Sequence, residues 1–200
     1  MIKRLKRAIL LGLSVVMLLS INQPVLAATN YVLIGGKLNG GVGNYGYNPR
    51  HYFITSSASS YKANVDSAME SWIRTTSRLG VTTPIYYEKV TVQKNSTMDI
   101  YAVSEPYLYA NAYTEFMKSG NNVDPSKVNW GWNKISINKP YFTNLSSKSE
   151  RDGVMAHEMG HCFGLDENNS NKYSIMCQSA YGRSVTKSQK CDLKGINALY

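Results

Sequence analysis

Residues 157–167 read H-E-M-G-H-C-F-G-L-D-E, and this stretch carries most of the information about fold and chemistry. His157 and His161 stand four residues apart, which places both on one face of an α-helix. Their imidazole nitrogens can therefore reach a single ion, and Zn²⁺ accepts such a pair. Glu158 follows the first histidine. We expect its carboxylate to reach the water that completes the metal's coordination and to act as a general base.

A third metal ligand requires the chain to turn back after His161. With a rise of about 1.5 Å per residue, position 167 of a continuing helix would lie roughly 9 Å beyond that histidine. Gly164 lacks a Cβ and can end the helix in the left-handed conformation. We expect Glu167 to return to the ion, because two histidines and one glutamate form a known catalytic zinc set. Asp166 is the competing ligand, and its spacing fits the third position less well.

Apolar periodicity predicts three helices. The residues from Ser60 to Thr76 repeat at helical spacing, so their apolar face is expected in the core. Ser149 and Asp152 resemble a capping arrangement for a helix that runs to about Phe163. A last helix is expected to open near Thr186 and Gln189, with Leu193, Ile196 and Tyr200 on one face.

Runs of β-branched and aromatic residues predict strands between these helices. The expected strands cover residues 52–55, 85–92, 98–103 and 134–138, whereas residues 107–116 remain ambiguous. Such a mixture along one chain indicates an α+β fold. We expect a twisted mixed β-sheet with an active-site helix, a helix packed on the sheet and a C-terminal helix.

The N-terminal sequence predicts export. Cations open the chain, an apolar run follows from Ala8 to Ile21, and small residues end at Ala27 and Ala28, as in a secretory signal peptide over residues 1–27. That apolar run is short for a membrane span, and no later stretch is long enough. We expect one domain over residues 28–200, in a secreted, monomeric protein of the extracellular space.

The net charge and its distribution argue against a nucleic-acid partner. Removing residues 1–27 takes away four cations and no anion, which lowers the formal charge from +9 to +5. This moderate surplus fits loose association with an anionic cell envelope, but no nucleic-acid motif or cationic block is present. Asn168 and Asn169 are expected to be polar loop residues. They are of a type that can bind Ca²⁺, but the sequence does not indicate a calcium site.

The three cysteines allow at most one internal disulfide. We expect Cys177 to pair with Cys191 in the oxidising extracellular environment. Cys162 would then be a small buried apolar residue.

The sequence resembles the metzincin zinc peptidases, and most of all the matrixin group. The resemblance is carried by residues 154–166 and by Ser174-Ile175-Met176 in the place of the family's methionine turn. It extends to Trp72, Asp99-Ile100, residues 135–138 and residues 192–200. By this resemblance the fold is metzincin-like (zincin-like), Met176 forms an apolar floor beneath the metal, and a sheet edge binds the substrate as an added strand. Residues 108–113 are expected to form part of that rim.

Three features depart from the family pattern. Glu167 stands where the third histidine is expected. Only His51 remains besides the two ligands, too few for a second zinc site, and it is expected to be an ordinary surface or strand-edge residue. No cysteine precedes Cys162 to plug the site from a pro-segment. The leading hypothesis is a secreted zinc metalloendopeptidase with one catalytic Zn²⁺ held by His157, His161 and Glu167. Glu158 would activate the water that hydrolyses a protein or peptide substrate. The alternative is a non-catalytic, zinc-stabilised module that binds the cell envelope. Tyr173 and Tyr181 are further candidates for assisting an oxyanion.

Overall fold

The computed structural model describes residues 30–200, so the expected signal peptide lies outside the described residues. Six strands form one mixed sheet in the order β2-β1-β3-β6-β4-β5. The strands are β1 (Arg50–Ile54), β2 (Tyr87–Lys89), β3 (Met98–Val103), β4 (Ala112–Lys118), β5 (Asn121–Asn122) and β6 (Trp132–Asn138). Neighbours from β2 to β6 run parallel, whereas β4 is antiparallel to both β6 and β5. The predicted α+β class with a mixed sheet is confirmed.

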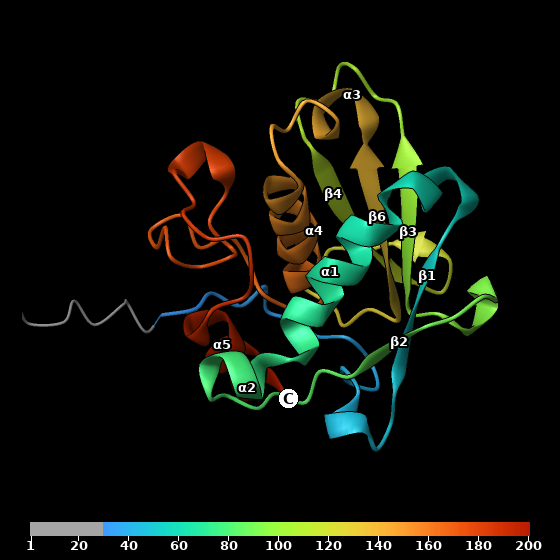
Figure 1. Cartoon of the computed structure of the whole chain (residues 1–200). Coiled ribbons are helices and arrows are strands. Elements are labelled where there is room, and N and C mark those ends of the chain that lie inside the picture. Colours follow the sequence, from blue (N-terminus) through green and yellow to red (C-terminus); the bar gives the residue numbers. More distant parts are fainter. Residues whose placement is uncertain (1–29) are drawn as a thin grey trace, which may run out of the picture.

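Two long helices pack beside this sheet (Figure 1). The α-helices are α1 (Lys62–Ile73), α2 (Thr75–Leu79), α3 (Lys139–Phe142), α4 (Lys148–Cys162) and α5 (Lys190–Leu199), and short 3₁₀ turns occupy η1 (Asn44–Gly46), η2 (Ser56–Tyr61), η3 (Gln93–Asn95) and η4 (Ser179–Tyr181). Helix α4 contacts β4 and β6, and α1 packs against α4. No helix in residues 30–200 is long and apolar enough to cross a bilayer.

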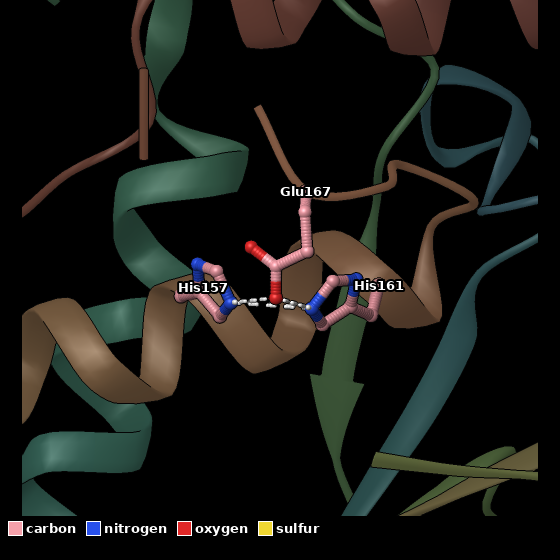
Figure 2. A group of neighbouring side chains, drawn as sticks. All are labelled: His157, His161 and Glu167. Atoms are coloured by element: carbon pink, nitrogen blue, oxygen red, sulfur yellow. Dashed lines mark hydrogen bonds and ion pairs between the residues drawn. The ribbon is translucent and has the colours of Figure 1, made fainter. Parts of the chain in front are cut away.

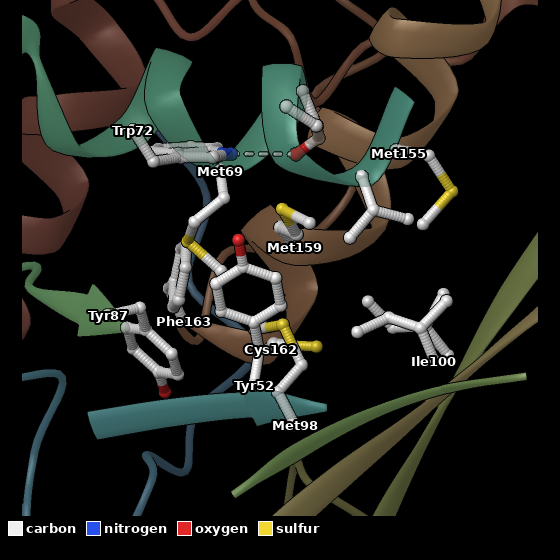
Figure 3. Packing of buried hydrophobic residues seen from close by; sticks show 14 of the residues in the cluster. Tyr52, Met69, Trp72, Tyr87, Met98, Ile100, Met155, Met159, Cys162 and Phe163 are labelled. Carbon is white, nitrogen blue, oxygen red and sulfur yellow. Dashed lines mark hydrogen bonds between the residues drawn. The ribbon is translucent and has the colours of Figure 1, made fainter. Parts of the chain in front are cut away.

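Aromatic and sulfur-containing side chains fill the space between α1, α4 and the sheet (Figure 3). The Trp72 and Phe163 rings are fully buried and meet edge to face with their centroids 5.3 Å apart. Trp72 also donates its indole N–H to the carbonyl of Ala156 at 3.0 Å, which fixes α1 against α4. Burying one such side chain contributes roughly 1.5–3 kcal/mol. The apolar face predicted for the first helix is therefore a core face.

The first two predicted helices, which correspond to α1 and α4, differ from prediction at their ends. Helix α1 stops at Ile73 because Arg74 leaves helical geometry, with φ −88° and ψ 58°, and α2 follows as a separate helix. Helix α4 is capped by Ser147, which accepts a hydrogen bond from the Glu150 amide at 3.1 Å, so the prediction of Ser149 was wrong. Ser149 does not cap the helix together with Asp152, because the Asp152 carboxylate accepts hydrogen bonds from Asn64 and Ser67 of α1.

The strand predictions were accurate near the centre of the sheet and poor at its edges. Strand β3 has the predicted bounds, whereas the run predicted at 85–92 is reduced to β2 because Tyr86 bonds the carbonyl of Val42 in an N-terminal loop at 2.9 Å. The ambiguous residues 107–116 divide into a loop and the start of β4. The edge strand β2 is short, so one hydrogen bond to a residue outside the sheet is enough to change its length.

Helix α5 opens at Gln189 and not at Thr186. Gln189 accepts a hydrogen bond from the backbone at Asp192, and the Asp192 carboxylate accepts one from the Gln189 amide, a reciprocal capping box. Leu193 and Ile196 are buried as expected, while Tyr200 accepts a hydrogen bond from the Leu38 amide at 2.9 Å.

The expected disulfide between Cys177 and Cys191 was wrong. All three cysteines are free and buried. The Cys177 sulfur lies near the carbonyls of Gln178 and Tyr181, whereas the Cys191 sulfur, on α5, contacts the Asn171 amide. Cys162 is fully buried, as expected of a small apolar residue.

The predicted reversal after α4 is present at Gly164, whose φ is +95°. The Leu165 amide donates to the Gly160 carbonyl at 3.0 Å and the Gly164 amide to the His161 carbonyl at 2.9 Å. This pair of hydrogen bonds is a Schellman motif, which satisfies the last helical carbonyls and redirects the chain. The segment beyond it then pairs with residues 32–34: Leu165 bridges Leu33 in antiparallel fashion.

We predict that Gly164→Ala destabilises the fold by about 3 kcal/mol, because a Cβ there would meet the Leu199 side chain as well as require an unfavourable φ. Gly120→Ala is the matched control, since its φ is +83° and nothing lies within 4 Å of the added carbon. It should cost about 1 kcal/mol. Chemical denaturation of both variants measures the difference. Equal losses would show that the crowding at Gly164 contributes nothing.

Candidate metal centre

Helix α4 and the segment after Gly164 bring three potential metal ligands together (Figure 2). One ligand atom each from His157, His161 and Glu167 lies within 4.8 Å of the other two. The two Nε2 atoms are 3.2 Å apart, and Glu167 Oε1 lies 3.4 Å from His157 Nε2 and 3.5 Å from His161 Nε2. Helical spacing supplies the two histidines, and the chain reversal supplies the carboxylate.

The hydrogen bonds around the histidines leave their inward nitrogens available. His157 Nδ1 donates to the Ile175 carbonyl at 2.9 Å, and His161 Nδ1 donates to the Leu165 carbonyl at 2.9 Å. A carbonyl can only accept, so each neutral ring carries its hydrogen on Nδ1 and presents a lone pair at Nε2. Both lone pairs point towards the Glu167 carboxylate (Figure 2).

One carboxylate oxygen of this group has no protein partner. Glu167 Oε2 is buried and accepts no hydrogen bond from the described residues. A buried acceptor without a partner is costly, and a cation beside it removes the cost. Two imidazole nitrogens and one carboxylate are ligands that Zn²⁺ prefers, and three protein ligands leave a position open. The residues present therefore fit a catalytic zinc ion.

The ligand residues are also electrostatically coupled. Burial alone would raise the pKa of Glu167 and lower that of His161. The interactions between the carboxylate and the two imidazoles outweigh burial, so the pKa of Glu167 falls to about 2 and that of His161 rises. The carboxylates of Glu167 and Glu158 thus stabilise the protonated form of His161. A metal ion has to displace that proton, so metal uptake is coupled to proton release.

A second layer of hydrogen bonds holds His157 in place. The buried Asp192 carboxylate accepts from the Ser174 hydroxyl, from the Ile175 amide at 3.1 Å and from the Gln189 amide at 2.7 Å. Burial raises the pKa of Asp192, although these donors oppose the shift. The segment that carries the Ile175 carbonyl is thereby fixed to the start of α5. Ligand orientation at metal sites commonly depends on such outer contacts.

Met176 packs directly beneath the metal-binding turn of α4. Its side chain is buried, and a Cβ added at Gly160 would overlap its sulfur. Gly160 lies between the two histidines in the sequence, so the thioether lies against the backbone of the ligand-bearing turn. This location is compatible with the apolar floor expected from the family resemblance.

Glu158 lies beside the ligand group and not within it. Its Oε2 accepts a hydrogen bond from the Thr114 hydroxyl of β4 at 2.8 Å, and its negative charge contributes to the raised pKa of His161. Glu158 and His157 line two cavities, of 230 Å³ and 480 Å³. A carboxylate at this position can exchange a proton with a molecule that enters either cavity.

The strand β4 borders both cavities. Residues 109–112 line the smaller one and residues 112–114 the larger one, which agrees with the rim expected at residues 108–113. Within residues 30–200, no strand pairs with the outer edge of β4 along residues 112–115. An extended peptide can add to such an edge through backbone hydrogen bonds.

Other candidates occupy different positions. The Asp166 carboxylate accepts from the Glu167 amide at 2.8 Å and is not one of the three clustered ligands. Tyr173 and Tyr181 are 49% and 62% exposed and line neither cavity, so nothing here supports an oxyanion role. His51 lies on β1, 3.8 Å from Glu88.

Three residues near the site were not anticipated as functional. Thr114 and Arg183 carry no motif, and only the fold brings them to Glu158 and to the smaller cavity. Asp192 belongs to the segment 192–200 that supports the family resemblance, and the capping box was its one local signal.

Comparisons with known proteins show distant structural likeness only. No family model matches the chain, and no curated protein matches its sequence. The GM1-bound form of the ECX AB5 holotoxin shares 14% identity at a TM-score of 0.49, over 86% of this chain and 88% of that chain. The structure of myroilysin shares 13% identity at a TM-score of 0.40, over 60% of this chain and 50% of that chain. Similarity at this level carries no functional argument.

We predict that Glu167→Ala lowers zinc affinity by more than about 100-fold, because losing a direct ligand exceeds the 10- to 100-fold cost of losing an outer partner. Asp166→Ala should lower it by about tenfold or less, since within residues 30–200 its carboxylate bonds the Glu167 amide and no metal ligand side chain. Competition with a chelator, followed by metal analysis, measures both. Equal zinc occupancy in the two variants would contradict the assignment of Glu167.

We also predict that Asp192→Ala lowers zinc affinity by about 10- to 100-fold although Asp192 touches no ligand. The same change should destabilise the fold by at least about 2 kcal/mol, because buried donors lose their acceptor. Glu88→Ala serves as the control: its side chain is exposed on β2 and lines neither cavity. Zinc titration and denaturation of both variants provide the comparison, and unchanged zinc affinity in Asp192→Ala would remove the outer-layer argument.

Proposed function

We propose that the chain is a secreted zinc metalloendopeptidase of metzincin type, similar to the matrixins, that hydrolyses peptide bonds. The observation that carries the proposal is the group formed by His157, His161 and Glu167, with the Glu158 carboxylate beside it on the same helix. A purely structural metal site needs no such base. The sequence features of residues 1–27 support secretion.

The metal would be held by His157, His161 and Glu167. When bound, Zn²⁺ supplies Lewis acidity, which polarises a carbonyl and makes water more acidic. Glu158 then accepts a proton from the attacking water and passes it to the departing amine. Thr114 holds Glu158 through its hydroxyl and leaves the other carboxylate oxygen free for that exchange.

The edge of β4 is the proposed substrate-binding strand. A peptide paired with residues 112–115 would pass between the two cavities that His157 and Glu158 line. Its backbone would provide affinity, and its side chains would enter the cavities on either side of the reacting bond. The substrate is therefore an extended segment of a protein or peptide.

We predict that Glu158→Gln lowers kcat for peptide cleavage by about 10²- to 10⁴-fold, because the amide cannot accept the proton. The variant should retain one zinc ion per chain, since Glu158 is not a ligand. Glu150→Gln is the control on the same helix, where the carboxylate bonds Ser146 at the exposed end. Assays on a mixed peptide library, with metal analysis of the same samples, provide the test.

Two results would reject the enzymatic proposal. Cleavage that persists in Glu158→Gln would exclude Glu158 as the base. A zinc-loaded wild-type protein that cleaves nothing, yet binds anionic envelope polymers, would favour the non-catalytic binding module.

A further inference from the structure

The smaller cavity beside the metal centre contains an arginine that the proposed reaction does not use. Arg183 lines this 230 Å³ cavity together with Ala112, Val154, Glu158, Gln178 and Ser179. Val154 and Glu158 come from α4 and Ala112 from β4, so the cavity adjoins both the general base and the proposed substrate strand. Arg183 is its only lysine or arginine.

The Arg183 guanidinium has few partners in the described part of the chain. One nitrogen donates to the Ile175 carbonyl at 3.4 Å, and no Asp or Glu oxygen in residues 30–200 lies within 4.0 Å of it. A guanidinium has five N–H donors. The side chain is only partly exposed, and burial lowers its pKa although Cys177, Glu158 and Glu167 oppose the shift. A desolvated cation with unused donors is suited to an incoming anion.

The larger cavity differs from the smaller one in its charged residues. It is lined by Glu158, Asp166 and Glu167 and contains no lysine or arginine. His157 and Glu158 line both cavities. A peptide bound in both cavities would therefore meet the Arg183 guanidinium in the smaller one and the Asp166 and Glu167 carboxylates in the larger one.

We propose that the cavity lined by Arg183 binds a carboxylate of the substrate, so that the enzyme selects an acidic residue at one of the two positions flanking the cleaved bond. This inference rests on the proposed peptidase function and names its substrate class. Arg183 is the specificity-determining residue, since its planar fork can donate two parallel hydrogen bonds to a carboxylate. Gln178 and Ser179 add polar lining, and Val154 offers an apolar wall for the methylene groups of Asp or Glu.

The carboxylate has two sources, an acidic side chain or the free C-terminus of a short product-like peptide. Peptides with Glu or Gln at each flanking position, made with a C-terminal acid or amide, distinguish them. For an acidic side chain, kcat/KM should be at least about tenfold higher with Glu than with Gln, at one flanking position only and regardless of the C-terminus. For a terminal carboxylate, amidation alone should produce the loss.

Variants test whether Arg183 is responsible. Arg183→Gln should reduce the Glu-over-Gln ratio to about one, and Arg183→Glu should shift the preference towards Lys, because the cavity charge is reversed. Lys187→Gln is the matched control: it removes one cation from an exposed position of the same segment and lines neither cavity. It should keep the wild-type ratio.

A binding measurement separates this inference from the peptidase proposal. The zinc-loaded Glu158→Gln protein is titrated with the same Glu and Gln peptides by calorimetry, so no cleavage is required. Tighter binding of the Glu peptide, lost when Arg183→Gln is added, supports the inference even if the wild type cleaves nothing. Equal binding of both peptides, or no acidic preference at either flanking position in wild-type cleavage, overturns it.

Discussion

The candidate site depends on the reversal of the chain at Gly164. The Schellman hydrogen bonds end α4 at Cys162, one residue after His161, and send the backbone back along the helix. The Leu165 carbonyl, just beyond the turn, accepts a hydrogen bond from His161 Nδ1. Two residues later, the Glu167 carboxylate faces both imidazoles. One backbone conformation thus places the third ligand and also orients the second. A straight helix would provide two histidines and nothing to close the site.

The carboxylate in the third position changes the electrostatics of the centre. Two neutral imidazoles and one glutamate leave a bound Zn²⁺ with a net charge near +1, so the site is less positive than one with three histidines and its water should be less acidic. Glu158 cancels most of the remaining charge. Arg183 donates to the Ile175 carbonyl, which also accepts a hydrogen bond from His157. Its positive charge lies at the smaller cavity and not at the larger one. The charge of this centre is therefore distributed unevenly across the proposed path of the substrate.

Sequence reasoning succeeded where the information is local. The helical spacing of His157 and His161, the glycine at the reversal and the runs of strand-forming residues around Ile100 and Ile135 are all local signals, and the corresponding elements are present. It failed where distant segments compete. The cap of α4 is Ser147 and not Ser149, because α1 engages Asp152. Strand β2 is shortened because Tyr86 pairs with an N-terminal loop, and Cys177 and Cys191 contact different neighbours. Thr114, Arg183 and Asp192 reach the site only through the tertiary fold.

The pairing of residues 32–34 with residues 164–166 joins positions separated by about 130 residues, and the Asn168 side chain bonds the Asn30 carbonyl over a comparable separation. Closing so long a loop costs entropy that is recovered only when both segments dock, and such non-local contacts slow folding. The segment that leads to Glu167 is consequently held by residues 32–34, which come from the other end of the described chain. Binding of a metal ion at this site would therefore depend on the completed tertiary structure, because a partly folded chain lacks the segment that supports the carboxylate.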